Sequence, residues 1–458
     1  MINPGQQSLI SEHVPESAHP SVHETRYEMR HESREASRRQ PVKAGVGAFI
    51  GTTIEWYDFY IFATGASLIF GQVFFPAGDR FLATLGALGT FAVGFFARPL
   101  GAVIFGSLGD RLGRRNMLVV TLLLMGLSTM LIGVLPTYRQ AGIVAPILLV
   151  ALRVVQGIAV GGEWGGAVLV ASEHSPKGRK SFFASLPQMG SPAGMILSII
   201  AFRIVTSMPQ ETLLTTGWRL PFLASAVLMV VGLLIRHGVH ETPEFEKARL
   251  YAPKSNSAWR VIREMPGRLL LAAGANTLGI SAVYFGSVFM LTYATQYLHL
   301  PRTMILDCVF VITVMQLLIT PVGAWIADKV GAGRVLIVTS LSTIVTAYVM
   351  YALINVGTMQ AILLGMGLNI FFGATFYAAI SGFCASLFPT EVRYSAVSIA
   401  YQGCAAIAGG LVPLLGTVLA EYFPGNWIPL ASAYAGAALI SALCVTALLV
   451  RGRRRVAI

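Results

Sequence analysis

Long apolar stretches alternate with short polar loops along most of the chain. Twelve of these stretches reach about 20 residues or more, the length at which a helix crosses about 30 Å of hydrocarbon. Within lipid, such a segment satisfies its backbone hydrogen bonds by forming a helix. The pattern therefore predicts an all-α membrane protein. The expected spans are 44–70, 82–109, 114–135, 143–171, 182–206, 217–236, 268–294, 304–328, 333–354, 358–386, 393–420 and 427–450.

Polar segments divide these spans into two sets. The chain begins with a polar stretch rich in Glu, Arg, Ser and His, which predicts a disordered cytoplasmic tail, and Met29 within it is an alternative start of translation. The longest interior polar segment separates six spans from six, so we interpret it as a central cytoplasmic loop between two six-helix bundles. A basic tail ends the chain. The expected parts are therefore 1–40, 41–236, 237–267, 268–450 and 451–458.

Charge is scarce and unevenly placed. Only 12% of the residues are charged and 55% are hydrophobic, whereas soluble domains carry about 25% charged residues. Of the 33 Lys and Arg, 26 fall in the tails and in alternate loops, four in the opposite loops and three within spans. The positive-inside rule then places both termini in the cytoplasm. The basic residues do not form a face interleaved with aromatic residues, so the sequence gives no indication of a nucleic-acid partner.

An internal repeat favours a carrier over a receptor. The loop after the second span reads GSLGDRLGRRNML from Gly106 to Leu118, and the loop after the eighth span reads GAWIADKVGAGRVLI from Gly323 to Ile337. Both loops occupy the same place in their six-span half. Many secondary transporters are built from two such similar halves, with a binding site between them near the bilayer midplane.

Ionisable residues inside the spans are functional candidates, because burying a charge in the membrane is costly. Glu55 and Asp58 are three residues apart, so we expect them on one helix face near the midplane. Two neighbouring carboxylates cannot easily both carry a charge there, so one is expected to hold a proton, as proton coupling requires. The alternative is that one of them pairs with a buried arginine and holds two helices together.

Three more charges lie within spans two and four. Glu163 lies in GGEWGG, where the glycines permit close helix approach, and it either couples protons or forms a structural ion pair. Arg153 is a candidate to modulate a carboxylate's proton affinity or to meet an anionic substrate. Arg98 either pairs with the carboxylates of the first span or binds a substrate carboxylate through two hydrogen bonds.

Uncharged polar groups within the spans predict a polar central cavity. Each alone is better explained by a hydrogen bond between helices than by a substrate contact, and the cavity is predicted from the set as a whole. The candidates are Tyr57, Gln188, Asn276, Tyr284, Asn369, Tyr377 and Gln402.

The sequence contains no motif that indicates an enzyme or a cofactor site. The eight histidines lie in tails, in loops or near span ends, and the four cysteines stand singly, which argues against a metal site. The Gly-rich loop with Lys-Ser/Thr that a nucleotide-driven pump needs does not occur. The G-x-S-x-G turn of a hydrolase does not occur either. We therefore expect no cofactor and no metal, and a monomer in the lipid bilayer that handles a small metabolite and protons.

The loop motif resembles the signature of the major facilitator superfamily, G-x-x-x-D-R-x-G-R-R. Five further stretches are similar to its metabolite:proton symporter family: GTTIEWYDFYIF, ALRVVQGIAVGGEWGGAVLVASE, GWRLPFL, HETPEFEKA and LFPTEVRYSA. The resemblance covers roughly residues 41–450. It implies two six-helix bundles that work by alternating access. Within the family, the chain is similar to the members that carry shikimate and to their close relatives.

The same resemblance implies a cytoplasmic gate at the two loops. Asp110, where the second span ends, is placed to bridge to another helix's polar end, and Arg114 is placed to pair with Glu173. We expect links of this kind to be modest individually. Ala332 departs from the usual basic residue in the second loop, which predicts a weaker gate there. The expected gate residues are Gly106, Asp110, Arg111, Gly113, Arg114, Arg115, Glu173 and Asp328.

These observations predict a proton-coupled symporter for a small organic acid such as shikimate. Three alternatives stay open: an uncoupled facilitator or exchanger, a carrier of osmolytes such as proline and betaine, and a dicarboxylate or 2-oxoglutarate symporter.

Overall fold

The structure is a computed structural model that describes residues 22–75, 80–237, 257–290 and 293–456. These residues form helices joined by short loops, and each of the twelve expected spans corresponds to one helix or to a run of consecutive helices. Within the described residues, eight helices are long and apolar enough to cross a membrane, and one bent pair adds a ninth. The other three expected spans correspond to α1, to α3 and to the broken pair of α18 and α19.

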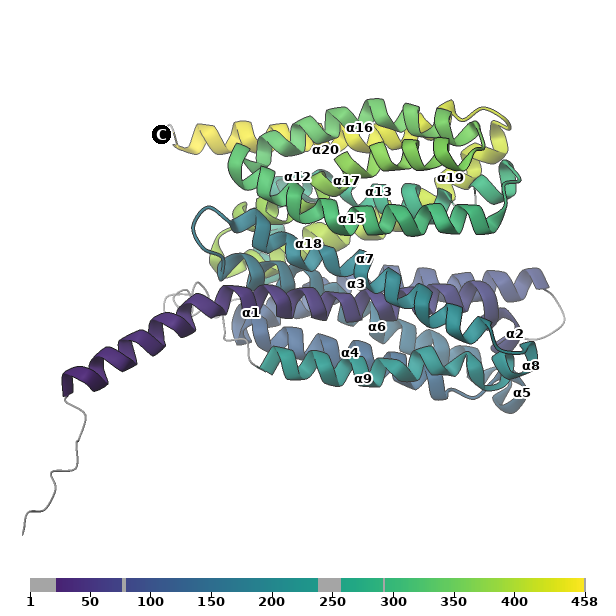
Figure 1. Cartoon of the computed structure of the whole chain (residues 1–458), viewed down its shortest axis with the longest axis horizontal. Helices are drawn as coiled ribbons and strands as arrows, with labels where there is room; N and C mark the ends of the chain where they lie inside the picture. Colours follow the sequence, from purple (N-terminus) through teal and green to yellow (C-terminus); the bar gives the residue numbers. More distant parts are fainter. Residues whose placement is uncertain (1–21, 76–79, 238–256, 291–292, 457–458) are drawn as a thin grey trace, which may run out of the picture. The chain divides into compact units, whose positions relative to one another are not determined.

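The long helices of the first half lie alongside one another (Figure 1). Its elements are α1 (Val22–Gly65) with η1 (Ala66–Phe70) and α2 (Gly71–Val73), α3 (Arg80–Leu112), α4 (Arg114–Val134), α5 (Tyr138–Ala141), α6 (Val144–Glu173), α7 (Lys180–Thr206), α8 (Gln210–Thr212), η2 (Leu213–Gly217) and α9 (Arg219–His237).

The second half is built in the same way. Its elements are α11 (Ser257–Glu264), α12 (Pro266–Ala275), α13 (Thr277–Val283), η3 (Tyr284–Phe289), η4 (Tyr293–Tyr297), α15 (Arg302–Val330), α16 (Ala332–Asn355), α17 (Met359–Ser386), η5 (Thr390–Val392), α18 (Arg393–Cys404), η6 (Ala405–Gly409), α19 (Gly410–Tyr422) and α20 (Ile428–Val456).

Helices pack mainly within their own half. In the first half α6 packs on α3, α4 and α7, and in the second half α16 and α17 pack on each other and on their neighbours α20 and α15. Two helix pairs, α3 with α18 and α7 with α15, make the largest contacts between the halves. Large apolar side chains on the outer faces, such as Leu234, Leu270 and Leu364, are more than half exposed, as expected for surfaces that face lipid.

Two expected parts of the chain differ from the structure, the N-terminal tail and the central loop. α1 begins at Val22, so residues 22–40 are helical and not disordered; residues 1–21 lie outside the described residues. The absence of apolar periodicity was a poor guide there, because a helix that extends from an existing span needs no new nucleus. The compact unit that holds the spans begins at Pro41. The expected central loop contains helix α11, which buries Ala258 and Val261, while residues 238–256 lie outside the described residues.

Two spans expected as single helices are interrupted. The seventh breaks at Asn276, whose side-chain amide donates to the carbonyl of Ala272 at 2.8 Å. The eleventh is divided by the π-helical turn η6, beside the glycine pair Gly409 and Gly410. Inserted side chains, glycines and π-turns are recognised causes of helix kinks.

Candidate functional site

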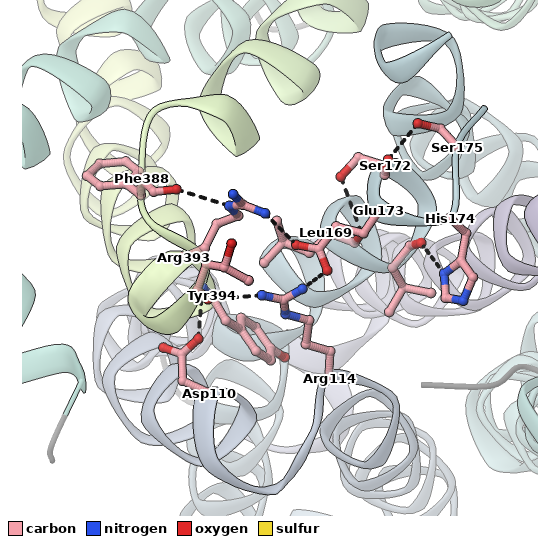
Figure 2. Close-up of polar contacts among 12 residues, drawn as sticks. Asp110, Arg114, Leu169, Ser172, Glu173, His174, Ser175, Phe388, Arg393 and Tyr394 are labelled. Atoms are coloured by element: carbon pink, nitrogen blue, oxygen red, sulfur yellow. Dashed lines mark hydrogen bonds and ion pairs between the residues drawn. The ribbon is translucent and has the colours of Figure 1, made fainter. Parts of the chain in front are cut away.

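Asp110 joins the two halves at the end of α3. Its carboxylate accepts the backbone N–H of Tyr394 at 3.1 Å and the N–H of Ser395 at 3.0 Å, and the Ser395 hydroxyl donates to it at 2.7 Å. The two N–H groups belong to the first turn of α18, whose donors have no partner inside the helix. A carboxylate at that position also interacts favourably with the helix dipole. Figure 2 shows Asp110 directed at the start of α18.

Asp328 makes the equivalent contact on the other side. It accepts the backbone N–H of Ser181 at 2.7 Å and the N–H of Phe182 at 2.9 Å, in the first turn of α7. Each aspartate is followed three residues later by a glycine with positive φ, Gly113 at 107° and Gly331 at 101°. A glycine is favoured there because other residues rarely adopt that conformation. The sequence repeat is thus a repeat of two helix caps.

Glu173 lies between two arginines beside the Asp110 cap (Figure 2). It forms an ion pair with Arg114 and a second one, at 2.8 Å, with Arg393 of the other half. Arg114 also donates to the carbonyl of Thr390 at 3.2 Å. The side chains of Arg114 and Glu173 are both 0% exposed. The expectation of a modest surface link is therefore wrong, because removing one partner of a buried pair is strongly destabilising.

The remaining residues of the loop motif differ in their surroundings. Gly106 lets α3 approach α18, since a Cβ there would lie 2.8 Å from the Cα of Ser395. Arg111 is exposed and Arg115 is partly buried. The glycines of GGEWGG act in the same way as Gly106: a Cβ on Gly166 would lie 2.6 Å from the Tyr394 hydroxyl.

Glu55 and Asp58 have different neighbours, although they lie close together on α1. Asp58 is fully buried among helices of the first half, where it accepts a hydrogen bond from Ser225 of α9. Glu55 lies near enough to Tyr377 of the second half to interact with it electrostatically. The expected shared face is thus divided: Asp58 belongs to the interior of one half and Glu55 to the contact between halves.

A chain of buried polar groups leads from Asp58 to Arg153. The Thr129 hydroxyl lies beside the Asp58 carboxylate. Gln156 donates to that hydroxyl at 2.7 Å, and Arg153 donates to the Gln156 carbonyl at 3.1 Å. Sequence reasoning missed Thr129, Gln156 and Ser225, because isolated polar residues in apolar helices are indistinguishable in one sequence from ordinary interhelical hydrogen-bonding groups.

Arg98 is not paired with the carboxylates of α1. Within the part of the chain that the structure describes, no carboxylate lies at ion-pair distance from its guanidinium, and the two roles predicted for Arg98 stay predictions. The guanidinium instead stacks on Phe95 at 4.2 Å and on Phe59 at 4.9 Å from the ring centroids. Arg153 stacks on the same Phe59 ring at 5.4 Å. One aromatic wall therefore carries two buried cations.

Glu163 faces α4 rather than the other half. The Thr121 hydroxyl donates to its carboxylate at 2.5 Å, and both side chains are buried. This contact holds α6 against α4. This hydrogen bond tests neither of the two roles predicted for Glu163, proton coupling and a structural ion pair.

Several polar candidates lie where the halves meet. Gln188 of α7 donates to the carbonyl of Tyr377 at 3.2 Å and accepts the indole N–H of Trp164 at 2.8 Å. Trp164 stacks on Tyr401 at 3.8 Å, and the hydroxyls of Tyr377 and Tyr401 are 3.0 Å apart. Sequence reasoning missed Trp164 and Tyr401, although Trp164 lies inside the GGEWGG motif.

Other candidates lie elsewhere or join helices directly. Tyr284 packs against Phe95 with ring centroids 5.8 Å apart, and it interacts electrostatically with Arg98. Tyr57 is a tie between α1 and α9, since its hydroxyl donates to the Pro221 carbonyl at 2.9 Å. The remaining three contacts are Asn276 to Cys384 at 3.4 Å, Asn369 to Tyr434 at 3.0 Å and Gln402 to the Val160 carbonyl at 3.1 Å.

Known transport proteins resemble this chain in sequence and in fold. The shikimate transporter of Escherichia coli is 37% identical over 432 residues, which cover 90% of this chain and 95% of that protein. The inner membrane metabolite transport protein YhjE of the same species is 36% identical over 88% of this chain and 93% of its own length. The family described as sugar (and other) transporter matches residues 44–264. The chain belongs to the metabolite transporters of the major facilitator superfamily.

Solved structures agree with this membership at the level of the fold. The proton:xylose symporter XylE, bound to 6-bromo-6-deoxy-D-glucose, superposes with a TM-score of 0.71 at 17% identity, over 89% of this chain and 95% of that one. The human organic anion transporter MFSD10 gives a TM-score of 0.64 at 15% identity, over 88% and 99% of the two chains. The transporter therefore has the twelve-helix fold of this superfamily, whose members are not enzymes. Among the described residues, no group of three His, Cys, Asp or Glu could hold a metal ion.

Proposed function

We propose that this metabolite transporter is a proton-coupled symporter for a small organic acid, working by alternating access between its two halves. Both termini face the cytoplasm of a bacterial cell with the transporter in the inner membrane, and the transporter works as a monomer. Uneven placement of Lys and Arg supports this orientation. Reporter fusions to each terminus test it, since a reporter active only outside the cytoplasm would contradict it.

The observation that carries proton coupling is the burial of Asp58. Ser225 donates to one oxygen of its carboxylate, and the Thr129 hydroxyl lies beside that carboxylate. A proton on the carboxylate would remove the cost of keeping its charge buried. Asp58 connects to Arg153 through Thr129 and Gln156. A change in the charge of Asp58 would therefore alter the hydrogen bonds that hold Arg153 near the contact between the halves. Glu55 and Glu163 remain secondary candidates for the same role.

Arg98 is the proposed anchor for the substrate's carboxylate. A buried guanidinium without an anionic partner is costly, and stacking on two aromatic rings offsets only about 1–2 kcal/mol each. Arg153 nearby adds a second positive charge. A bound carboxylate would compensate the charge of Arg98 and would be attracted by that of Arg153. The related shikimate transporter supports an organic acid as the substrate.

The cytoplasmic gate is the set of contacts at the ends of α3 and α15. While Asp110 caps α18 and Asp328 caps α7, the two halves are held together at these ends. The gate opens when both aspartates release the helix termini and Arg393 of the second half separates from Glu173. Substrate and proton would then leave to the cytoplasm.

Uptake into proteoliposomes tests the coupling. Labelled shikimate should accumulate above equilibrium only when an inward-directed proton gradient is present. Asp58→Asn should keep exchange of substrate but lose accumulation. Asp307→Asn is a matched control, because Asp307 is an exposed aspartate within helix α15.

Other results separate the alternatives. Equilibration without accumulation would indicate an uncoupled facilitator or exchanger, and gradient-driven uptake by Asp58→Asn would exclude Asp58 as the coupling group. Preference for proline or betaine would indicate an osmolyte carrier, as in the related proline/betaine transporter of Escherichia coli at 31% identity. Preference for 2-oxoglutarate or another dicarboxylate would indicate the remaining alternative.

A further inference from the structure

The second half contains a narrow pocket that the proposed transport site does not yet use. Helix α13, η3, α15, α16 and α17 surround it, and its lining includes Ala282, Gly286, Gln316, Met350, Asn369 and Tyr377. Pockets that bind small ligands are mostly apolar, with a few polar groups that fix orientation. This lining has that composition.

Two amides supply the polar part of the lining. The side-chain amide of Gln316 is partly buried, and within the described part of the chain it makes no hydrogen bond. Asn369 is oriented by its neighbours: it donates to the Tyr434 hydroxyl at 3.0 Å, and Thr346 donates to its carbonyl at 3.3 Å. An amide carries two N–H donors, so one donor of Asn369 is left for another partner. Both amides can therefore serve a hydroxyl group.

Tyr377 connects this pocket to the two arginines. It lines the pocket, Gln188 of the first half bonds its backbone carbonyl, and Arg98 acts electrostatically on its hydroxyl. Tyr284, which begins η3 next to the pocket residue Val283, packs on the Phe95 ring that supports Arg98. Tyr377 thus belongs both to the pocket lining and to the surroundings of Arg98.

We propose that this pocket is a specificity subsite for the hydroxyl-bearing, uncharged end of an organic acid whose carboxylate faces Arg98. The inference rests on the proposed function, because it takes an organic acid as the substrate. Gln316 and Asn369 bond the hydroxyls, and Met350 with Met366 packs against the carbon skeleton. Methionine suits this purpose because its flexible side chain adapts to irregular shapes.

Selectivity between hydroxylated and unsubstituted acids follows from the two amides. An acid without hydroxyls would leave the Gln316 and Asn369 amides without partners in a water-poor pocket, which is costly. A site that bonds a substrate hydroxyl rejects the analogue that lacks it far more strongly than an apolar site can. The subsite therefore selects on hydroxyl groups, while Arg98 selects on charge.

The first test removes one amide. Equilibrium binding to the purified full-length transporter is measured by calorimetry at one pH, with shikimate and with cyclohex-1-ene-1-carboxylate, the same ring acid without hydroxyls. Gln316→Leu should weaken shikimate binding about 5- to 10-fold, the value of one hydrogen bond. Binding of the unsubstituted acid should change by less than about twofold. Gln360→Leu is the matched control, since Gln360 is an exposed glutamine of α17.

The second test fills the pocket. A Cβ added at Gly286 meets no atom within 4 Å, so a larger side chain enters open space. Gly286→Leu should weaken binding of both acids about 10-fold or more by occupying the subsite. Gly436→Leu is the control, because Gly436 of α20 also has open space around its Cβ and lies outside the pocket lining. Gly286→Ala, measured beside it, should give a smaller effect in the same direction, and it covers the case in which Gly286→Leu does not fold.

Clear results would overturn the proposal. Wild-type protein that binds neither acid would refute the organic acid of the proposed function and the subsite with it, whereas protein that binds both acids equally would refute the subsite alone. Unchanged shikimate binding in both Gly286→Leu and Gln316→Leu would also overturn it, as would tight binding of glycine betaine that the variants do not alter. Since binding is measured without a gradient, failure of Asp58 as the coupling group leaves these results unaffected, and the two proposals fail separately.

Discussion

Replacing Glu173 by glutamine tests the gate where the structure makes it strongest. The substitution keeps the shape of the side chain and removes the charge that Arg114 and Arg393 share. Removing one partner of a buried ion pair costs about 3–5 kcal/mol. Both arginines keep a backbone acceptor, the carbonyl of Thr390 at 3.2 Å and that of Phe388 at 3.1 Å. We therefore expect the lower end, about 3 kcal/mol, against the closed state.

The cost falls on one conformation only. When the halves separate, water reaches these groups, so the open state does not bear the penalty. A change of about 3 kcal/mol shifts the closed-to-open ratio roughly 100-fold, and a 99:1 mixture becomes nearly even. The separation is measured with spin labels at two exposed positions, Leu112 of α3 and Glu391 beside α18, each changed to cysteine in a background without the native cysteines. Double electron–electron resonance then gives the distribution of distances between the two labels.

The control is an ion pair of the same chemistry on the surface. Arg260 and Glu264 are four residues apart on α11, with side chains 36% and 54% exposed. Such pairs contribute only about 0.3–0.5 kcal/mol, so Glu264→Gln should shift the same ratio by about twofold at most. An unchanged distance distribution for Glu173→Gln, or equal effects of both variants, would refute the buried latch.

Two further predictions follow from single contacts. Asp110→Asn should leave the protein folded and inserted but reduce uptake per reconstituted protein about 10-fold, because it loses a charge-assisted cap, and Asp328→Asn should reduce uptake less; full activity of Asp110→Asn would remove its gate role. Tyr57→Phe should lower thermal stability by about 1 kcal/mol, the value of one hydrogen bond, without changing shikimate affinity, and a lower affinity would return Tyr57 to the substrate site.

The sequence predicts those features that depend on local pattern. Span positions follow from apolar length, and the loop motif identifies Asp110 because the chemistry of a carboxylate at a helix end is local. The breaks at Asn276 and η6 were not foreseen, since neither residue type forces a kink by itself. The helical state of residues 22–40 was missed for the related reason that a charged segment can continue an existing helix.

The cavity is less predictable because its residues come from separate helices. Arg98 and Asp58 are both buried charges in adjacent spans, and pairing them is the simplest assumption from sequence. In the structure, Arg98 faces aromatic rings while Asp58 faces Ser225, and the difference depends on helix rotation. Rotation is set by packing between helices, which the charge pattern of one chain does not contain.

The two gate loops have the same cap but unequal reinforcement. Arg114 is the first residue of α4, and the first residue of α16 is Ala332; α6 ends at Glu173, whereas α17 ends at Ser386. Among the described residues, the equivalent positions beside Asp328 therefore offer no ion cluster like the one at Glu173, and Asp328 makes two bonds to the start of α7. Separating α3 from α18 must break the cap and the ion pair that joins Glu173 to Arg393, whereas separating α15 from α7 at this end must break the Asp328 cap without an ion pair of that kind. We therefore expect opening to begin at α7, and the Asp110 side to set the barrier. This is why Asp328→Asn should matter less than Asp110→Asn.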